Sequence, residues 1–298
     1  MNYVKSKNIR VYLCSSVVLI ILLSTLQIHA SSLQDFTDTD SAILIVSTET
    51  GKILGSANAD LFDTQYPPAS LMKVFTAIAF YQDHGNKFPA LHCPPSLASD
   101  PKGCWDRNGH GKVGIVEAIG YSCNVYFRQL AHRTSHEIFH QTLQKFDLPN
   151  SDRVDDIHSV MTGKTLDWTV SPLMLLRAYA ALFNGGYLYS HGKQDAKHIA
   201  LDEPVRKILY QGMKHASQHG TSLEAKKAAG QLMLGKTGTS LLWTDGKVNW
   251  RETQGYWIGL YPSEKPKFAV LTLVRKGRGA TDAAPLGGKA LSWFLKTQ

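Results

Sequence analysis

Residues 268–274 (FAVLTLV) and residues 42–47 (AILIVS) decide the fold of this 298-residue chain. Each is a short, almost wholly apolar run bounded by turn-forming residues, which is typical of a buried strand. Residues 52–57 follow the first run as its hairpin partner, and residues 231–239 and 255–261 predict two more strands. Because neither end of the chain has enough strands to make a core alone, we expect both ends to form one sheet.

The middle of the chain is helical in pattern. Apolar residues at helical spacing predict helices over residues 70–80, 113–132, 135–146, 171–183 and 204–216, and a closing helix over residues 284–296. We therefore expect an α/β fold of the α+β kind. Its antiparallel sheet is flanked by helices, and an all-helical subdomain is inserted at about residues 76–216.

The first thirty residues differ from the rest. Lys5, Lys7 and Arg10 precede an apolar run and a small residue at Ala30, which is the layout of a secretory signal peptide or, uncleaved, a membrane anchor. We expect a leader over residues 1–30, one domain over residues 31–298, and export to the periplasm or the outer face of the cytoplasmic membrane. The net charge of +8 is mild and no Lys/Arg run occurs, so we expect no nucleic-acid partner.

Three cysteines follow the leader. Cys93 and Cys104 flank a loop rich in Pro, Ser, Asp and Gly, and export permits disulfides, so we expect these two to be bridged. Two free thiols are the alternative. Cys123 is expected to be free and buried.

Ser70 and Lys73 form a Ser-x-x-Lys pattern at the start of an apolar helix. Three residues are about one helical turn, so both side chains emerge on one face. Burial lowers the pKa of a lysine, and a neutral lysine can accept the proton of a serine hydroxyl. The pair therefore suits a nucleophile and its base.

Ser122 and Asn124 form a Ser-x-Asn pattern after an apolar stretch. The hydroxyl of Ser122 can relay a proton to a leaving amine. The amide of Asn124 can bond a peptide carbonyl or hold Lys73. By itself this pattern is equally typical of a capping serine and a structural asparagine.

Lys236, Thr237, Gly238 and Thr239 fall in the predicted strand at 231–239. The two threonine hydroxyls and the lysine charge suit a carboxylate next to a scissile bond. Gly238 lets a substrate backbone lie close. The backbone N–H groups of Ser70 and Thr239 are candidates for an oxyanion hole.

Taken together, in this order, the three motifs resemble those of the penicillin-binding protein transpeptidase domain, within the serine β-lactamase and penicillin-binding protein superfamily. The segments 109–127, 171–186 and 219–239 are also similar to that family. The resemblance implies that Ser70 is the nucleophile and Lys73 its base, with Lys236 and Ser122 completing the catalytic set. It also implies that Asn124, Thr237, Gly238 and Thr239 bind substrate, without a metal or organic cofactor.

The implied activity is that of a serine D,D-transpeptidase or carboxypeptidase on D-alanyl-D-alanine stem peptides of peptidoglycan, with β-lactams bound covalently through Ser70. Cell-wall remodelling proteins are the expected partners. Many family members carry a long N-terminal module, so we expect a minimal catalytic unit here.

Other functions compete with this one. The β-lactamase class with a dedicated glutamate places it after the second motif, yet no Glu lies between Glu137 and Glu203. A class D-like β-lactamase, which uses a carboxylated motif lysine, or a β-lactam sensor would share Ser70 and Lys73, although class D usually has Val where Asn124 stands. An inactive peptidoglycan-binding module is another alternative. His136 and His140 match His-Glu-x-x-His, the zinc-protease pattern, but no third ligand occurs at the expected spacing.

Overall fold

The computed structural model describes residues 32–298, apart from residues 98–99, 101, 152–153, 191–195 and 245–246. The leader expected at residues 1–30 lies outside these described residues. Within them, none of the helices combines the length and the apolar character needed to span a bilayer.

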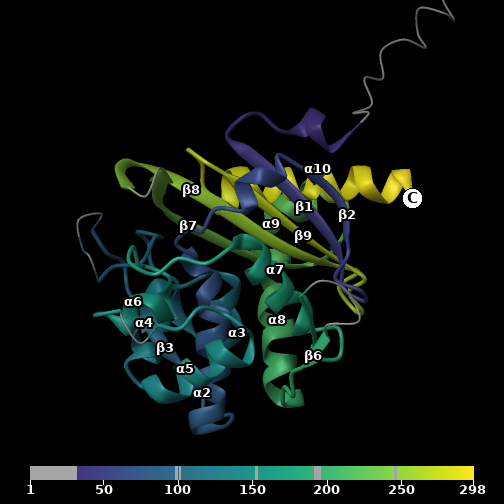
Figure 1. Ribbon diagram of the computed structural model, residues 1–298. Coiled ribbons are helices and arrows are strands. Elements are labelled where there is room, and N and C mark those ends of the chain that lie inside the picture. Colours follow the sequence, from purple (N-terminus) through teal and green to yellow (C-terminus); the bar gives the residue numbers. More distant parts are fainter. Residues whose placement is uncertain (1–31, 98–99, 101, 152–153, 191–195, 245–246) are drawn as a thin grey trace, which may run out of the picture. The chain divides into compact units, whose positions relative to one another are not determined.

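A five-stranded antiparallel sheet forms the centre of the fold, in the order β2-β1-β9-β8-β7. The first two strands and the last three therefore join in one sheet, as the sequence predicted (Figure 1). Strand β1 pairs directly with β9, so that Leu44 lies opposite Leu271. The strands are β1 (Ser41–Ser47), β2 (Ile53–Ala57), β7 (Leu234–Thr244), β8 (Lys247–Tyr261) and β9 (Phe268–Val274).

Both faces of the sheet are buried, because successive side chains on a strand point to opposite sides. On β1, Leu44 joins the large core shared with the helical block, whereas Ile43 and Ile45 join a smaller core beneath α10 (Ala284–Thr297). On β8, Ile258 and Trp257 divide in the same way. This double burial explains why β1 and the second half of β8 are mostly apolar rather than alternating.

Helices cover the two faces unequally. Helices α9 and α10 lie on one side, and the remaining helices form a block on the other (Figure 1). The helices are α2 (Lys73–His84), α3 (Ile115–Gly120), α4 (Asn124–Ala131), α5 (His136–Lys145), α6 (Ile157–Thr162), α7 (Pro172–Ala181), α8 (Glu203–His219), α9 (Leu223–Ala229) and α10 (Ala284–Thr297). Short 3-10 turns are η1 (Leu33–Phe36), η2 (Ala59–Phe62) and η3 (Ala69–Met72), and η5 (Gly279–Ala283) is a π turn.

The inserted block is not all-helical, contrary to the expectation from sequence. Two small hairpins interrupt it: β3 (Leu91–Cys93) with β4 (Gly111–Val113), and β5 (Tyr187–Tyr189) with β6 (Ala196–His198). Each strand has three residues, too short for the apolar period of two to be visible in the sequence.

The helix predicted over residues 113–132 is in fact two helices. It breaks at residues 121–123, where Ser122 adopts a left-handed backbone conformation with φ 53°. Cys123 is extended and caps α4, since its Sγ accepts a hydrogen bond from the N–H of Tyr126 at 3.5 Å. The break turns the Ser122 side chain toward the sheet.

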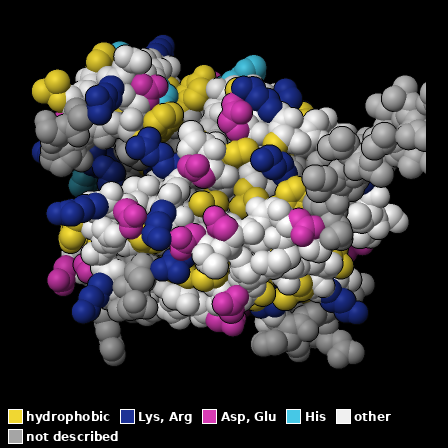
Figure 2. All heavy atoms as spheres, turned by 90° about the horizontal axis from the view of Figure 1, so that it is seen from above, with side chains coloured by type: hydrophobic (Ala, Val, Ile, Leu, Met, Phe, Trp, Pro, Cys, Tyr) yellow, Lys and Arg dark blue, Asp and Glu magenta, His cyan; other side chains and the backbone are white. Residues whose placement is uncertain are grey.

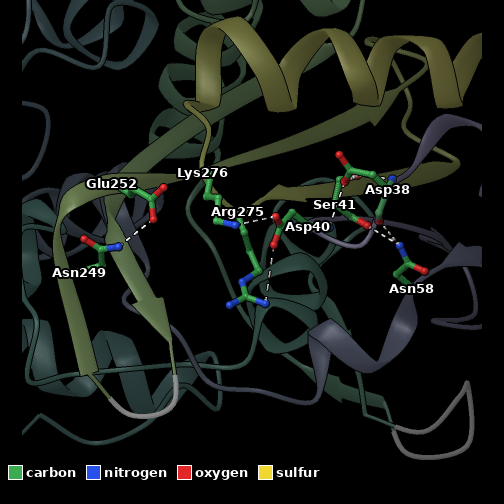
Figure 3. Close-up of polar contacts among 8 residues, drawn as sticks. All are labelled: Asp38, Asp40, Ser41, Asn58, Asn249, Glu252, Arg275 and Lys276. Atoms are coloured by element: carbon green, nitrogen blue, oxygen red, sulfur yellow. Dashed lines mark hydrogen bonds and ion pairs between the residues drawn. The ribbon is translucent and has the colours of Figure 1, made fainter.

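Polar contacts join the segments next to the neighbouring strands β1 and β9, which come from opposite ends of the chain (Figure 3). Asp40, just before β1, pairs with Lys276 at 3.1 Å and with Arg275 at 3.9 Å, both just after β9. Ser41 Oγ donates to Asp38 at 2.7 Å, and the Asn58 amide donates to the Ser41 carbonyl at 2.7 Å. Partly exposed ion pairs contribute about 0–1 kcal/mol each, so the buried strands supply most of the stability.

On the face shown in Figure 2, the described Lys, Arg, Asp and Glu side chains are interspersed. A nucleic-acid surface would gather cations on one face or along one helix. This face therefore offers no argument for such a partner.

Candidate functional site

Ser70 lies in the 3-10 turn η3, directly before α2, and is partly exposed. The residue before it, Ala69, has φ 54°, which is uncommon for a side chain other than glycine. The turn is anchored from behind by Tyr179, whose hydroxyl donates to the Leu71 carbonyl at 2.6 Å. Strained backbone of this kind persists where the surrounding packing imposes it, commonly at active sites.

Two glycines pack directly against this turn. A Cβ on Gly163, which caps α6, would come within 1.7 Å of the Ala69 carbonyl oxygen. A Cβ on Gly238 would lie 3.0 Å from Ala69 Cβ and 3.3 Å from Leu71 Cγ. From the sequence, we expected Gly238 to let a substrate backbone lie close. In the structure, its missing side chain leaves room for the turn that carries Ser70.

We expect Gly163→Ala to displace the Ser70 turn, with a loss of stability of about 1–3 kcal/mol from overpacking and slower acylation of Ser70. Gly230→Ala is the matched control, because Gly230 also has positive φ (66°, against 75° for Gly163) but nothing within 4 Å of its added Cβ. Thermal unfolding and the rate of labelling by a fluorescent penicillin measure both effects. Equal losses in the two variants would show that φ strain, not contact with the turn, limits this position.

Lys73 begins α2 and is completely buried. Its Nζ donates to the Ser122 carbonyl at 2.8 Å and to Asn124 Oδ1 at 2.7 Å, and lies 3.4 Å from Ser122 Oγ. Burial lowers the pKa of this lysine from 10.5 to about 7. Of the two roles considered for Asn124, the geometry shows the one in which its amide holds Lys73.

Lys236 is also completely buried, and its Nζ donates to Ser122 Oγ at 2.8 Å and to the Thr237 carbonyl at 2.7 Å. Burial, followed by the nearby charge of Lys73, lowers the pKa of Lys236 well below its usual range. From the sequence, we expected the charge of this lysine to bind a substrate carboxylate. The structure instead directs it to Ser122, which therefore lies between two lysines.

A cleft of about 530 Å³ opens in front of these groups. Ser70, Ser122 and Asn124 line it from the helical block, and Thr237, Gly238 and Thr239 line it from β7, the edge strand of the sheet. The hydroxyl of Thr237 donates to that of Thr221 at 2.6 Å, and the hydroxyl of Thr239 accepts from the Gly279 N–H at 2.9 Å. Every residue of the three motifs thus lines the cleft or lies directly behind it.

Three cations that the sequence analysis did not select also line the cleft: Arg107, Lys164 and Arg278. No Asp or Glu is among the described residues that line it. Such a lining suits a substrate that carries a carboxylate. The signal for Arg278 in the sequence was its position between two glycines, four residues after the end of the apolar run at residues 268–274.

The zinc-protease pattern does not form a ligand set. His136 Nε2 lies 3.2 Å from His158 Nε2, whereas His140 Nδ1 lies 2.9 Å from the Ser151 hydroxyl. The two histidines of the pattern therefore face different partners. Among the described residues, the one group of His, Cys, Asp or Glu side chains that brings at least three donor atoms together does not include them.

The expected disulfide is absent, and this prediction from the sequence was wrong. Cys93, Cys104 and Cys123 are all free thiols in the structure. Cys93 and Cys123 are buried, and Cys104 is partly buried. Cys104 Sγ lies 3.9 Å from Cys123 Sγ, so the loop cysteine faces the Ser-x-Asn motif.

Comparison with known proteins agrees with the fold and identifies the family. The sequence model described as "Penicillin binding protein transpeptidase domain" matches residues 41–292, so the chain belongs to this family. It is 23% identical, over 77% of its length, to the Haemophilus influenzae protein named peptidoglycan D,D-transpeptidase MrdA. The chain spans about two fifths of the length of the curated relatives that it matches, 41% and 44% for two of them.

Solved structures show the same fold at low identity. PBP2 of Pseudomonas aeruginosa superposes with a TM-score of 0.69 at 20% identity, over 86% of this chain and 71% of that one. PBP2 of Helicobacter pylori, solved in a complex with MreC, gives 0.67 at 22% identity, over 86% and 59%. The α+β fold predicted from the sequence is confirmed.

Proposed function

We propose that this chain is a peptidoglycan D,D-transpeptidase that acts through an acyl-enzyme on Ser70. The observation that carries the proposal is the buried cluster behind the cleft, in which Lys73 and Lys236 both contact Ser122. Two buried lysines meeting at one serine are costly, because burial opposes their charge. An arrangement of this kind is typical of proton transfer, since one lysine is readily kept neutral.

The reaction begins at Ser70. Its Oγ attacks the carbonyl carbon of the penultimate D-Ala, and its proton passes to neutral Lys73. Ser122, 3.4 Å from the Lys73 Nζ, then relays a proton to the departing D-Ala amine. An acceptor amine releases the acyl group by transpeptidation, whereas water would release it by carboxypeptidation.

The substrate carboxylate is held at the β7 side of the cleft. Thr237 and Thr239 present hydroxyls there, and Arg278 supplies a positive charge at the same wall. The absence of a described Asp or Glu from the lining leaves no carboxylate there to activate water against the acyl-enzyme. This favours a transferase over a β-lactamase that deacylates through a dedicated Asp or Glu.

Labelling with a fluorescent penicillin tests the proposal. We expect one stable covalent adduct per chain, lost in Ser70→Ala but retained in the exposed control Ser56→Ala and in His136→Ala. A pentapeptide stem with an acceptor amine should then give the cross-linked product by mass spectrometry. Rapid penicillin turnover would indicate a β-lactamase instead, and the absence of both adduct and turnover would leave a peptidoglycan-binding module.

We further propose that the chain acts outside the cytoplasm, where its substrate lies, and works beside other cell-wall proteins. The leader pattern at residues 1–30 supports export, and the MreC complex of the Helicobacter pylori protein supports such partners. Fractionation of cells that express the tagged chain tests the location. Tag recovered in the cytoplasm would contradict it.

A further inference from the structure

A second group of reactive side chains lies directly behind the Ser-x-Asn motif. It consists of Cys93 at the end of β3, Cys104 and His110 in the following loop, and Cys123 at the start of α4. One donor atom from each residue lies within 4.8 Å of every other. Nothing in the proposed acyl-transfer chemistry uses these four groups.

Three of the six separations between these donor atoms are close to those of a tetrahedral metal site. With Zn–S of 2.3 Å and Zn–N of 2.0–2.1 Å, a tetrahedral zinc ion places two sulfurs about 3.8 Å apart, and a sulfur and a nitrogen about 3.6 Å apart. Cys104 Sγ lies 3.9 Å from Cys123 Sγ, and His110 Nδ1 lies 3.5 Å from both Cys93 Sγ and Cys104 Sγ. The imidazole is oriented by stacking on Tyr121, with ring centroids 5.2 Å apart and an interplanar angle of 10°.

We propose that Cys93, Cys104, His110 and Cys123 hold a Zn²⁺ ion that fixes the bend at residues 121–123 and the loop at residues 102–110. Three sulfurs and one imidazole nitrogen are the donor set of a structural zinc site, and soft thiolates select zinc over magnesium or calcium. Four protein ligands leave no open position for a substrate or a reactive water. The ion therefore has a positioning role and is not a second catalytic centre.

The ion would act on the catalytic groups through Cys123, which stands between Ser122 and Asn124 in the chain. Ser122 has the left-handed φ of 53°, a conformation that needs support from its surroundings. On the other side of the ion, the loop at residues 102–110 carries Trp105, which lines the cleft and donates its Nε1–H to the Tyr121 carbonyl at 2.9 Å. One metal thus joins a wall of the cleft to the Ser-x-Asn motif.

The thiolate donors also make this centre sensitive to oxidation. A hydroperoxide would oxidise two thiolates to a disulfide: with hydrogen peroxide, two thiolates and two protons give one disulfide and two waters, and the zinc ion is released. Cys104 and Cys123 are the favoured pair, since their sulfurs are 3.9 Å apart and Cys104 is partly exposed. A cavity of about 510 Å³ borders His110 and provides access.

Metal analysis of the full chain, purified under reducing conditions, tests the site without reference to activity. We expect one zinc per chain, and tetrahedral Co²⁺ spectra with sulfur-to-metal charge transfer after exchange. Cys104→Ser and His110→Ala should weaken zinc binding at least about 100-fold. The matched control is His92→Ala, an exposed histidine next to Cys93, which should keep full occupancy. Zinc at trace level with no cobalt spectrum, or equal occupancy in the ligand variants, would overturn the proposal.

The positioning role rests on the proposed function and needs a second measurement. Wild-type protein stripped of zinc by a chelator with reductant, and still folded by circular dichroism, should acylate about 10–100-fold more slowly. Zn²⁺ should restore the rate, and Mg²⁺ should not. Ser70→Ala should retain zinc while failing to label, which separates failure of the two proposals. An unchanged rate in the stripped, folded protein would contradict the positioning role.

Peroxide treatment tests the oxidation step. We expect release of one zinc per chain, a disulfide between Cys104 and Cys123 in the peptide map, and recovery of the acylation rate by reductant with Zn²⁺. Retention of zinc at peroxide levels that oxidise a free thiol would rule this step out.

Discussion

Lys73→Ala should slow the acylation of Ser70 by about 10²–10⁴-fold, the range for loss of a positioned general base. Its Nζ is held by the Ser122 carbonyl and by Asn124 Oδ1, at 2.8 and 2.7 Å, on the first residue of the helix that follows Ser70. The measurement is the second-order rate of penicillin labelling. Lys207→Ala, an exposed lysine on α8, is the control and should keep the wild-type rate.

Lys73 should also determine how the rate of Ser70 acylation depends on pH. Its pKa is lowered from 10.5 to about 7 by burial, and only the neutral amine accepts a proton. The neutral fraction grows as pH rises through 7, so the wild-type rate should rise about tenfold per pH unit well below 7 and level off above it. The residual rate of Lys73→Ala should lack this step. A flat wild-type profile, or a variant close to wild type, would contradict the assignment of Lys73 as base.

The central strands were predictable because a strand that is buried on both faces has a nearly continuous apolar sequence. Residues 268–274 and 42–47 are almost wholly apolar, because α10 covers one face of these strands and the helical block covers the other. We could predict that these two strands belong to one sheet, because neither end of the chain has enough strands to form a core alone. The register of that pairing, with Leu44 opposite Leu271, depends on contacts between distant segments and was not predictable.

The break at residues 121–123 could not be predicted in this way. Apolar residues continue at helical spacing from Ile119 to Val125, so the local pattern favours one helix. The left-handed Ser122 arises from tertiary contacts, including the hydrogen bond from Lys236, which is 114 residues further along the chain. Intrinsic helix propensity has little effect on the backbone conformation where such tertiary contacts oppose it.

The cysteines show the same limit. Their spacing in sequence made a bridge between Cys93 and Cys104 the natural expectation, since both flank one loop. Their chemistry depends on the approach of Cys123, from the start of α4, and on the fold of the loop that brings His110 back to the two cysteines. The missed signal is that all four potential donors fall within about thirty residues around the second motif.

Lys236→Ala should reduce acylation by about 10²–10³-fold, the usual cost of removing one preorganised donor at a reacting centre. The structure and the sequence pattern give different reasons for the importance of Lys236 in acylation. The pattern directs Lys236 to the substrate carboxylate, whereas its Nζ lies 2.8 Å from Ser122 Oγ and is fully buried. A lysine that acts through Ser122 should matter equally for every substrate whose leaving amine needs that proton.

Penicillin and its methyl ester separate the two roles, because the ester lacks the carboxylate charge. If Lys236 acts through Ser122, Lys236→Ala should slow both compounds by the same factor, and its effect should be far from additive with that of Ser122→Ala. Arg278→Ala is the matched comparison: Arg278 lines the cleft, so its loss should slow penicillin and leave the ester nearly unaffected. If Lys236→Ala instead slowed penicillin but left the rate with the ester unchanged, Lys236 would be the residue that binds the substrate carboxylate. Its Nζ would then have to turn from Ser122 into the cleft when substrate binds.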